Sequence, residues 1–394
     1  MPTLRQLFLQ HLAQTSDIPL ALEIDRAEGL YLYDPSGKAY LDLISGIAVS
    51  ALGHRHPAVL QAAREQMDRY LHTLVYGEFV LAPQVRLAEA LCAALGPGFD
   101  SVYFVNSGSE AVEGAMKLAK RFTGGPHIVA CREAYHGSTQ GAASLMEPTT
   151  FTRAYHPLLP GIRHIRFNHS EDLETIDADC AAVIIEPVQA EAGVRPPDPA
   201  FFQALRRRCT ETGALLVFDE IQTGYGRTGS LWAFQQLGVV PDVILLAKAM
   251  GGGFPIGAFA TRREIMHCLS QDPPLGHITT FGGHPVSCAA ALATLRTLQS
   301  GPWIAAVKDK EALFRQRLRH PAIRELRSAG LLLALELESF ERVRKVQLAC
   351  LEKGLLTDWF LFNERSLRIA PPLLIEEEQI EWACQTLLQT LEEV

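Results

Sequence analysis

Four short apolar runs, each ending abruptly in polar or glycine residues, constrain the fold of this chain most strongly. They are rich in β-branched and aliphatic residues and begin at Ser101, Ala181, Ala214 and Asp242. Amphipathic stretches separate such runs, and this alternation is typical of α/β proteins with a mostly parallel sheet. Strands that are apolar almost without a break are covered on both faces. The sequence therefore predicts a mostly parallel central sheet with helices on both faces.

The composition narrows the partners and the compartment. The chain has 394 residues, of which 48% are hydrophobic, so it can bury a large core and form two or three domains. Its formal net charge of −8 leaves no basic excess for a nucleic acid. No uninterrupted apolar stretch approaches the length of a membrane span, and the cysteines form no CxxC pair. We expect a cytoplasmic protein without nucleic-acid or membrane partners.

The ends of the predicted strands should lie together, because ligands of open α/β sheets bind outside the carboxyl ends of the strands. These ends offer the segment 106–109, Glu186, Asp219 and Lys248. Two structural interpretations of the lysine stay open at this point. Its stem could lie on apolar surface with the ammonium in water, or Lys248 and Asp219 could form a structural ion pair.

Two further features favour a cofactor site. Ser107 can cap a helix whose first free N–H groups, around Gly108 and Ser109, form a ready seat for a phosphate. The "YHG" at 135–137 offers a flat ring near the same edge. A lysine amine, a buried carboxylate, a phosphate seat and an aromatic plate are the four requirements of pyridoxal phosphate (PLP). Burial of Lys248 would disfavour its ammonium form and leave the free amine for a Schiff base.

Eight separate stretches extend this prediction, and they occur in one order: "GIAVSALGHRHP", "NSGSEA", "YHG", "EPVQAEAG", "FDEIQTGYGRTG", "LAKAMGGGFPIGA", "TTFGGHP" and "LRIAPPL". With them the chain, from about Pro19 to near its C-terminus, resembles the class III PLP-dependent aminotransferases of fold type I. That group holds acetylornithine, ornithine and 4-aminobutyrate aminotransferases. The resemblance implies a homodimer whose active sites lie at the interface.

The resemblance also implies a reaction. An amino group would pass from an ω-amino compound or amino acid, through a lysine-bound PLP imine, to a 2-oxo acid. We expect 2-oxoglutarate as the acceptor, and pyruvate stays open. A mutase, racemase or decarboxylase of the same fold is the alternative, because the cofactor supplies the chemistry and the protein steers it. A non-catalytic PLP-binding regulator is disfavoured, because the chain has neither spare length nor basic charge for a DNA-binding module.

Carried over to this sequence, the resemblance implies these cofactor residues: Ser107, Gly108, Ser109, Tyr135, His136, Glu186, Asp219, Gln222, Lys248 and, from the other subunit, Thr280. Lys248 would form the imine, Asp219 would face the pyridinium nitrogen, and Gln222 would lie near the ring hydroxyl. Tyr135 would stack on the ring, and Glu186 would be a structural acid behind the cofactor. The catalytic residues would be Lys248 and Asp219.

The substrate side matches the family only in part. Arg368 occupies the position of the arginine that holds the substrate carboxylate, with Glu191 as the acid that pairs with it when that carboxylate is absent. Ser138 stands where acetylornithine and ornithine enzymes have a carboxylate-binding arginine, and Asp17 stands where the ornithine enzyme has a tyrosine. We therefore expect poor use of acetylornithine and ornithine.

The remaining predictions concern domains and metals. We expect a large domain at 53–283 and a small domain formed by 1–52 and 284–394. In "GHRHP" no carboxylate or cysteine lies at ligand spacing from the histidines, so we assign no metal. The N-terminal segment has leucines at helical spacing and predicts a helix.

Overall fold

The central sheet carries the strands that the apolar runs predict. The computed structural model describes residues 2–147 and 149–394. Seven strands pair in the order β4-β10-β9-β8-β7-β5-β6. Their bounds are β4 Ser101–Val105, β5 His127–Cys131, β6 Ile162–Ile165, β7 Cys180–Ile185, β8 Leu215–Asp219, β9 Val243–Leu246 and β10 Gly257–Thr261. Strand β10 runs antiparallel to both of its neighbours, whereas the other pairs are parallel. The mostly parallel sheet is confirmed.

Helices alternate with these strands along the chain. The α-helices are α1 Leu4–His11, α2 Ser45–Ala48, α3 Pro57–Met67, α4 Ala82–Leu95, α5 Gly108–Thr123, α6 Gln140–Ser144, α7 Pro199–Thr212, α8 Arg263–Met266, α9 Pro285–Ser300, α10 Trp303–Arg317, α11 Phe340–Glu352 and α12 Glu377–Glu393. Short 3-10 helices are η1 Thr149–Phe151, η2 Arg153–Tyr155, η3 Ser170–Thr175, η4 Ala233–Gln236, η5 Lys248–Gly251 and η6 His267–Ser270. The predicted N-terminal helix is α1, and none of its residues is buried. None of the helices in the described ranges is long and apolar enough to cross a membrane.

Both faces of the central sheet are covered, and β7 illustrates why. Successive side chains of a strand point to opposite faces. Val183 and Ile185 belong to one apolar core together with residues of α7, whereas Ala182 and Ile184 belong to a second core together with residues of α5. All four side chains are fully buried. This is the reason why the run from Ala181 is apolar without alternation.

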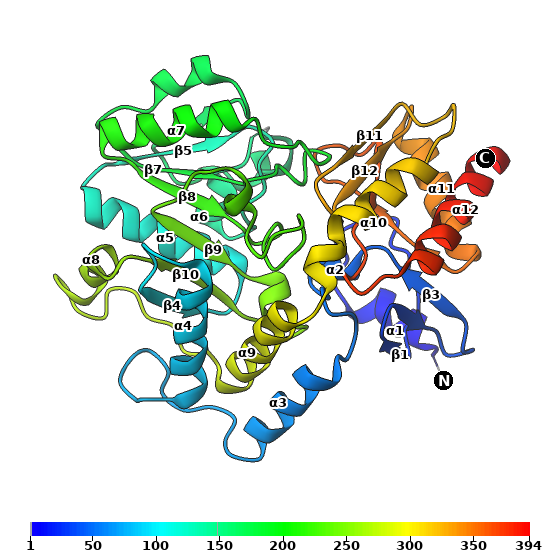
Figure 1. Cartoon of the computed structure of the whole chain (residues 1–394), viewed down its shortest axis with the longest axis horizontal. Helices are drawn as coiled ribbons and strands as arrows, with labels where there is room; N and C mark the ends of the chain where they lie inside the picture. Colours follow the sequence, from blue (N-terminus) through cyan, green and yellow to red (C-terminus); the bar gives the residue numbers. More distant parts are fainter. Residues whose placement is uncertain (1, 148) are drawn as a thin grey trace.

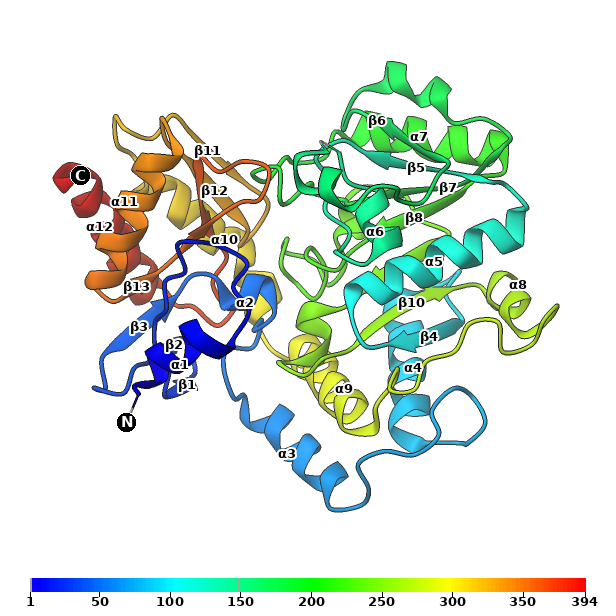
Figure 2. The same cartoon turned by 180° about the vertical axis from the view of Figure 1, so that it is seen from behind.

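Two smaller sheets lie beside the central one (Figures 1 and 2). The first has the order β1-β2-β3-β13, with β1 Arg26–Glu28, β2 Tyr31–Tyr33, β3 Ala39–Asp42 and β13 Leu355–Leu356. The second has the order β11-β12-β15-β14, with β11 Glu325–Ser328, β12 Leu333–Glu336, β14 Asp358–Trp359 and β15 Ser366–Ile369. Because β13 pairs with β3, N-terminal and C-terminal segments share one sheet. Both views place the two termini in this part of the molecule.

Candidate active site

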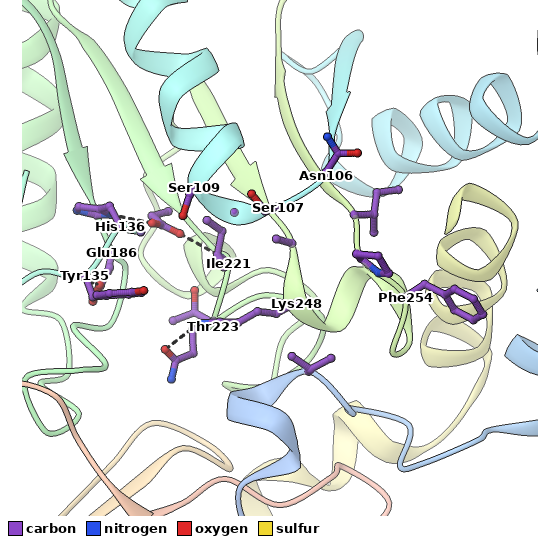
Figure 3. Close-up of a pocket in the computed structure, with 18 of the residues that line it drawn as sticks. Asn106, Ser107, Ser109, Tyr135, His136, Glu186, Ile221, Thr223, Lys248 and Phe254 are labelled. Atoms are coloured by element: carbon purple, nitrogen blue, oxygen red, sulfur yellow. Dashed lines mark hydrogen bonds and ion pairs between the residues drawn. The ribbon is translucent and has the colours of Figure 1, made fainter. Parts of the chain in front are cut away.

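A pocket of about 450 Å³ lies at the edge of the central sheet where β4, β7, β8 and β9 end. In Figure 3, Tyr135, His136 and Glu186 lie together on one side of it, and Ser107 and Ser109 belong to the start of α5. Nine of the ten predicted cofactor residues line the pocket: Ser107, Gly108, Ser109, Tyr135, His136, Glu186, Asp219, Gln222 and Lys248. The structure thus brings together residues that span more than 140 positions of the chain.

Lys248 lies two residues beyond the end of β9 and begins η5 with a φ of 47°, a left-handed conformation that is strained for a lysine. Its ammonium donates a hydrogen bond to Oε1 of Gln222 over 3.3 Å. Burial lowers the pKa of Lys248, against the opposing attraction of Glu191 and Asp219. The amine is therefore more readily deprotonated than that of an exposed lysine, which is what a nucleophilic or proton-transferring lysine requires.

Asp219, at the end of β8, is buried and paired with a histidine rather than with Lys248. Its Oδ2 lies 2.7 Å from Nδ1 of His136, and its Oδ1 accepts a hydrogen bond from the backbone N–H of Ile221 over 3.0 Å. Burial alone would lower the pKa of His136, but the hydrogen bond and the charge of Asp219 raise it. The pair fixes the orientation of the carboxylate at the pocket wall. A direct ion pair between Asp219 and Lys248 is not present.

Glu186, behind the pocket at the end of β7, holds two backbone groups. It accepts hydrogen bonds from the N–H of Tyr135 over 3.2 Å and from the N–H of Ala190 over 2.9 Å. Burial raises its pKa to about 7. These contacts position the Tyr135 backbone, and the phenol oxygen of Tyr135 lies 3.0 Å from Oγ of Ser138.

The start of α5 forms the predicted anion seat. Ser107 is the N-cap, and its Oγ accepts a hydrogen bond from the N–H of Glu110 over 3.2 Å. The backbone N–H groups of Gly108 and Ser109 make no hydrogen bond within the described ranges, as expected for the first turn of a helix. A Cβ at Gly108 would lie 2.9 Å from Cδ1 of Ile221, so a larger residue would have to push that side chain aside. The helix end can therefore bind a phosphate closely.

The residues around the pocket fit the chemical groups of PLP. A partly buried amine with a lowered pKa, a buried carboxylate and a free helix start surround one pocket. Among the described residues, Nε2 of His136 and Nε2 of Gln222 are buried polar atoms without a hydrogen-bond partner. Buried polar groups are normally paired, so these two atoms indicate that a polar molecule belongs in the pocket.

The second predicted constellation is a buried ion pair near Lys248. The guanidinium of Arg368, on β15, donates two hydrogen bonds to the carboxylate of Glu191, over 2.8 Å and 3.0 Å. The charges of both residues act on the pKa of Lys248. The side chain of Arg368 is 2% exposed and that of Glu191 is 10% exposed. This bidentate geometry is the one an arginine uses for a carboxylate.

Besides Arg368 and Glu191, three predicted residues do not line this pocket: Ser138, which is exposed, Thr280 and Asp17. Thr280 is exposed and does not line it, although the neighbouring Thr279 accepts a hydrogen bond from Nδ2 of Asn106 at the pocket edge. Asp17 is exposed in the segment between α1 and β1 and does not line the pocket either. No group of three or more metal-ligating side chains occurs in residues 2–147 and 149–394.

Sequence reasoning missed Asp358, which belongs to none of the motifs described above. Its Oδ1 lies 2.9 Å from Nε of Arg368. A signal exists in the sequence, because Asp358 and Arg368 lie ten residues apart on two short strands that could form a hairpin. It also missed the apolar pocket residues Val188, Ile221 and Phe254, which no spacing connects.

Known proteins resemble this chain over nearly its whole length. Residues 12–391 match the family described as Aminotransferase class-III. An acetylornithine aminotransferase from Methanopyrus kandleri is 39% identical over 386 residues, which cover 97% of this chain and 96% of that protein. A structure of the ornithine aminotransferase from Toxoplasma gondii, with partial occupancy of PLP at its active site, superposes with a TM-score of 0.91 at 30% identity and covers 98% of this chain and 93% of that one. An (S)-enantioselective ω-transaminase from Thermomicrobium roseum gives a TM-score of 0.89 at 28% identity, covering 98% and 97%.

Fold and site together define a fold type I, PLP-dependent enzyme. The chain belongs to the class III aminotransferases. Its substrates are an amine donor and a keto acid. The alternatives of a mutase, a racemase, a decarboxylase and a non-catalytic regulator are thereby set aside.

Proposed function

We propose that this aminotransferase takes its amino group from an ω-amino compound or amino acid and passes it to 2-oxoglutarate. The observation that carries the acceptor side is the end-on fork of Arg368, which holds the Glu191 carboxylate through two hydrogen bonds. A substrate carboxylate has the same shape and charge as that of Glu191, so it can take the same place. Pyruvate, whose single carboxylate the same fork can hold, stays the second candidate.

Each site residue has a distinct task in this proposal. The N–H groups of Gly108 and Ser109 would bind the phosphate of PLP, and Tyr135 would cover its ring. Asp219 holds a proton on the ring nitrogen, and His136 keeps the Asp219 carboxylate in place and ionised. Gln222, whose Nε2 has no partner in the structure, would contact the ring hydroxyl.

The chemistry divides between the cofactor and Lys248. When bound, PLP would supply an electron-withdrawing ring that stabilises the negative charge on a deprotonated substrate carbon. Lys248 moves that proton at its Nζ, for which its lowered pKa prepares it. The apolar side chains of Val188, Ile221 and Phe254 exclude water from the pocket.

The donor side rests on Ser138. In place of an arginine, the chain has a serine whose hydroxyl contacts the phenol of Tyr135 over 3.0 Å. Of the described residues that line the pocket, only His136 and Lys248 are basic, and both have other tasks. A desolvated carboxylate without a cation is penalised by about 2–5 kcal/mol. We therefore propose a donor without a carboxylate at that distance from the reacting amine.

Steady-state kinetics on acetylornithine, ornithine, 4-aminobutyrate and simple diamines test the donor. We expect higher kcat/KM for diamines than for acetylornithine, and Ser138→Arg should raise kcat/KM for acetylornithine. Ser138→Ala is the matched control and should not raise it. Efficient use of acetylornithine by the unmodified enzyme would show that the proposal from Ser138 is wrong.

We also propose a homodimer in which Thr280 of each subunit reaches the phosphate of the other. The exposure of Thr280, beside a Thr279 that contacts the pocket edge, supports this assignment. A cytoplasmic location is proposed as well, supported by cysteines that are all free in the structure.

A further inference from the structure

The guanidinium of Arg368 is held on more than one edge. Of the guanidinium nitrogens, Nη1 and Nη2 donate to Glu191, whose Oε2 also accepts from the backbone N–H of Leu361 over 3.1 Å. On the other edge, Nε donates to Oδ1 of Asp358 over 2.9 Å, and Nη2 donates a further hydrogen bond to the backbone carbonyl of Trp359 over 3.1 Å. The ring of Phe360 lies under the guanidinium, 4.5 Å from its central carbon. Three consecutive residues therefore hold the arginine independently of Glu191.

Strand pairing fixes these contacts. Asp358 on β14 lies directly opposite Arg368 on β15 in an antiparallel pair. Oγ1 of the preceding Thr357 donates to the carbonyl of Arg368 over 2.5 Å, and the carbonyl of Thr357 accepts from Nε2 of Gln347 on α11 over 2.9 Å. The Asp358 carboxylate is thus placed by the sheet and not by a mobile loop.

The charges of the cluster are unequal, because one guanidinium faces two carboxylates. Burial raises the pKa of Asp358 to about 6, while Arg368 opposes this shift and Glu191 and Asp42 add to it. Asp358 is therefore ionised at pH 7.5. If Glu191 moves away, Arg368 keeps one carboxylate partner and its side-on hold. When a substrate carboxylate then binds, the guanidinium again faces two carboxylates. The exchange therefore replaces the carboxylate of Glu191 by that of the substrate.

We propose that Asp358 is a positioning residue that orients Arg368, so that its terminal nitrogens stay aimed at the place that Glu191 and the substrate carboxylate occupy in turn. This inference rests on the proposed role of Arg368 as the carboxylate-binding residue. Without Asp358, the guanidinium could follow Glu191 when that side chain moves, and the carboxylate would meet a misplaced partner. Asp358 thereby contributes to selection of the keto acid without contacting it.

The test compares Asp358→Ala with Asp358→Asn in the PLP-loaded enzyme. Alanine removes the acceptor for Nε, whereas the amide oxygen of asparagine can still accept this hydrogen bond. We expect Asp358→Ala to raise KM for 2-oxoglutarate about 10- to 100-fold, the range for a hydrogen bond to a charged group, with little change of kcat. Asp358→Asn should recover most of the loss. Calorimetric titration with glutarate, an unreactive dicarboxylate, should show the same order of affinities.

Two comparisons separate this inference from the proposed function. The first half-reaction with a diamine, which carries no carboxylate, should proceed at an unchanged rate in both variants. An equal loss with the diamine and with 2-oxoglutarate would overturn the inference, because it would indicate a merely structural role. Arg368→Lys should also raise KM for 2-oxoglutarate. If Arg368→Lys leaves this KM unchanged, the proposed role of Arg368 is wrong. If Arg368→Lys raises it but Asp358→Ala does not, only the proposed role of Asp358 is wrong.

Discussion

At the scale of single residues, Lys248 is the most exacting assignment. Its backbone is strained, its side chain lines the pocket, and its pKa is lowered. We predict that borohydride treatment of the yellow holoenzyme attaches the cofactor covalently to the peptide that contains Lys248, since the unprotonated amine is the form that reacts. Peptide mass spectrometry locates the label. Label on a different lysine would contradict the assignment.

Asp219→Asn tests the second catalytic assignment. The variant keeps the shape of the side chain but removes the charge that faces His136 and, in our proposal, the ring nitrogen. Loss of a charge-assisted hydrogen bond of about 1.5–3 kcal/mol should lower kcat roughly 10- to 100-fold. The absorbance of bound PLP shows whether the cofactor is retained. Asp177→Asn, which removes an exposed partner of Arg163, is the control and should leave kcat unchanged.

Single residues also show what sequence reasoning can and cannot find. Lys248 and Asp219 were predicted because each stands at the end of an apolar run, and parallel strands end at one edge of the sheet. The partner of Asp219 was not predictable in this way, since the 2.7 Å contact with His136 depends on side-chain placement across 83 positions of the chain. Asp358 was missed for a related reason, because its contact with Arg368 depends on the register of two short strands.

At the scale of elements, the direction of β10 was not predictable. An apolar run shows that a strand is buried on both faces but not which way it runs, and β10 is antiparallel to β4 and β9. This direction places Gly257 opposite Val105, at the end of β4. The strand thereby passes close to the turn that begins α5.

Gly257→Ala tests this close approach. A Cβ at Gly257 would lie 2.3 Å from the carbonyl oxygen of Ser107, the N-cap of α5, so either β10 or the helix start has to shift. Overpacking of this kind costs about 1–3 kcal/mol. We expect a lower Tm and weaker PLP binding, measured by thermal unfolding and by spectroscopic titration of the apoenzyme. At Gly276 a Cβ meets nothing closer than 3.3 Å, so Gly276→Ala should bind PLP normally.

At the scale of the whole molecule, the division into domains stays a proposal. We propose a large domain at 53–283 and a small one formed by 1–52 and 284–394, supported by the small sheet that joins β3 with β13. Helix α9, just beyond this boundary, packs against α3 and α4. If α9 is counted with the large domain because of this packing, the boundary moves to Gly301. The sequence gives no linker there, so only packing can place it.

Assembly is the other property of the whole molecule. Exposed apolar side chains occur near His72 and near Phe281. These two segments meet, because the ring centroids of His72 and Phe281 lie 4.6 Å apart. Phe281 is 53% exposed, and Val80 in the same region is 92% exposed. Extended apolar surface of this kind marks contacts between proteins. Because Thr280 directly precedes Phe281, a second copy on this surface would receive the Thr280 hydroxyl.

Complementation between inactive subunits tests this arrangement. We predict that Lys248→Ala and Thr280→Ala homodimers each lose most activity, and that mixing them after partial unfolding and refolding restores part of it. In the heterodimer one site combines an intact Lys248 with an intact Thr280 from the neighbouring subunit, whereas the other site lacks both. The expected recovery is therefore at most one working site for each heterodimer. Differently tagged subunits, purified through both tags, show that heterodimers have formed. A contrary result would be that Thr280→Ala homodimers are inactive and the purified heterodimers are inactive as well. In that case Thr280 serves its own subunit, and the active site does not cross the interface in the proposed way.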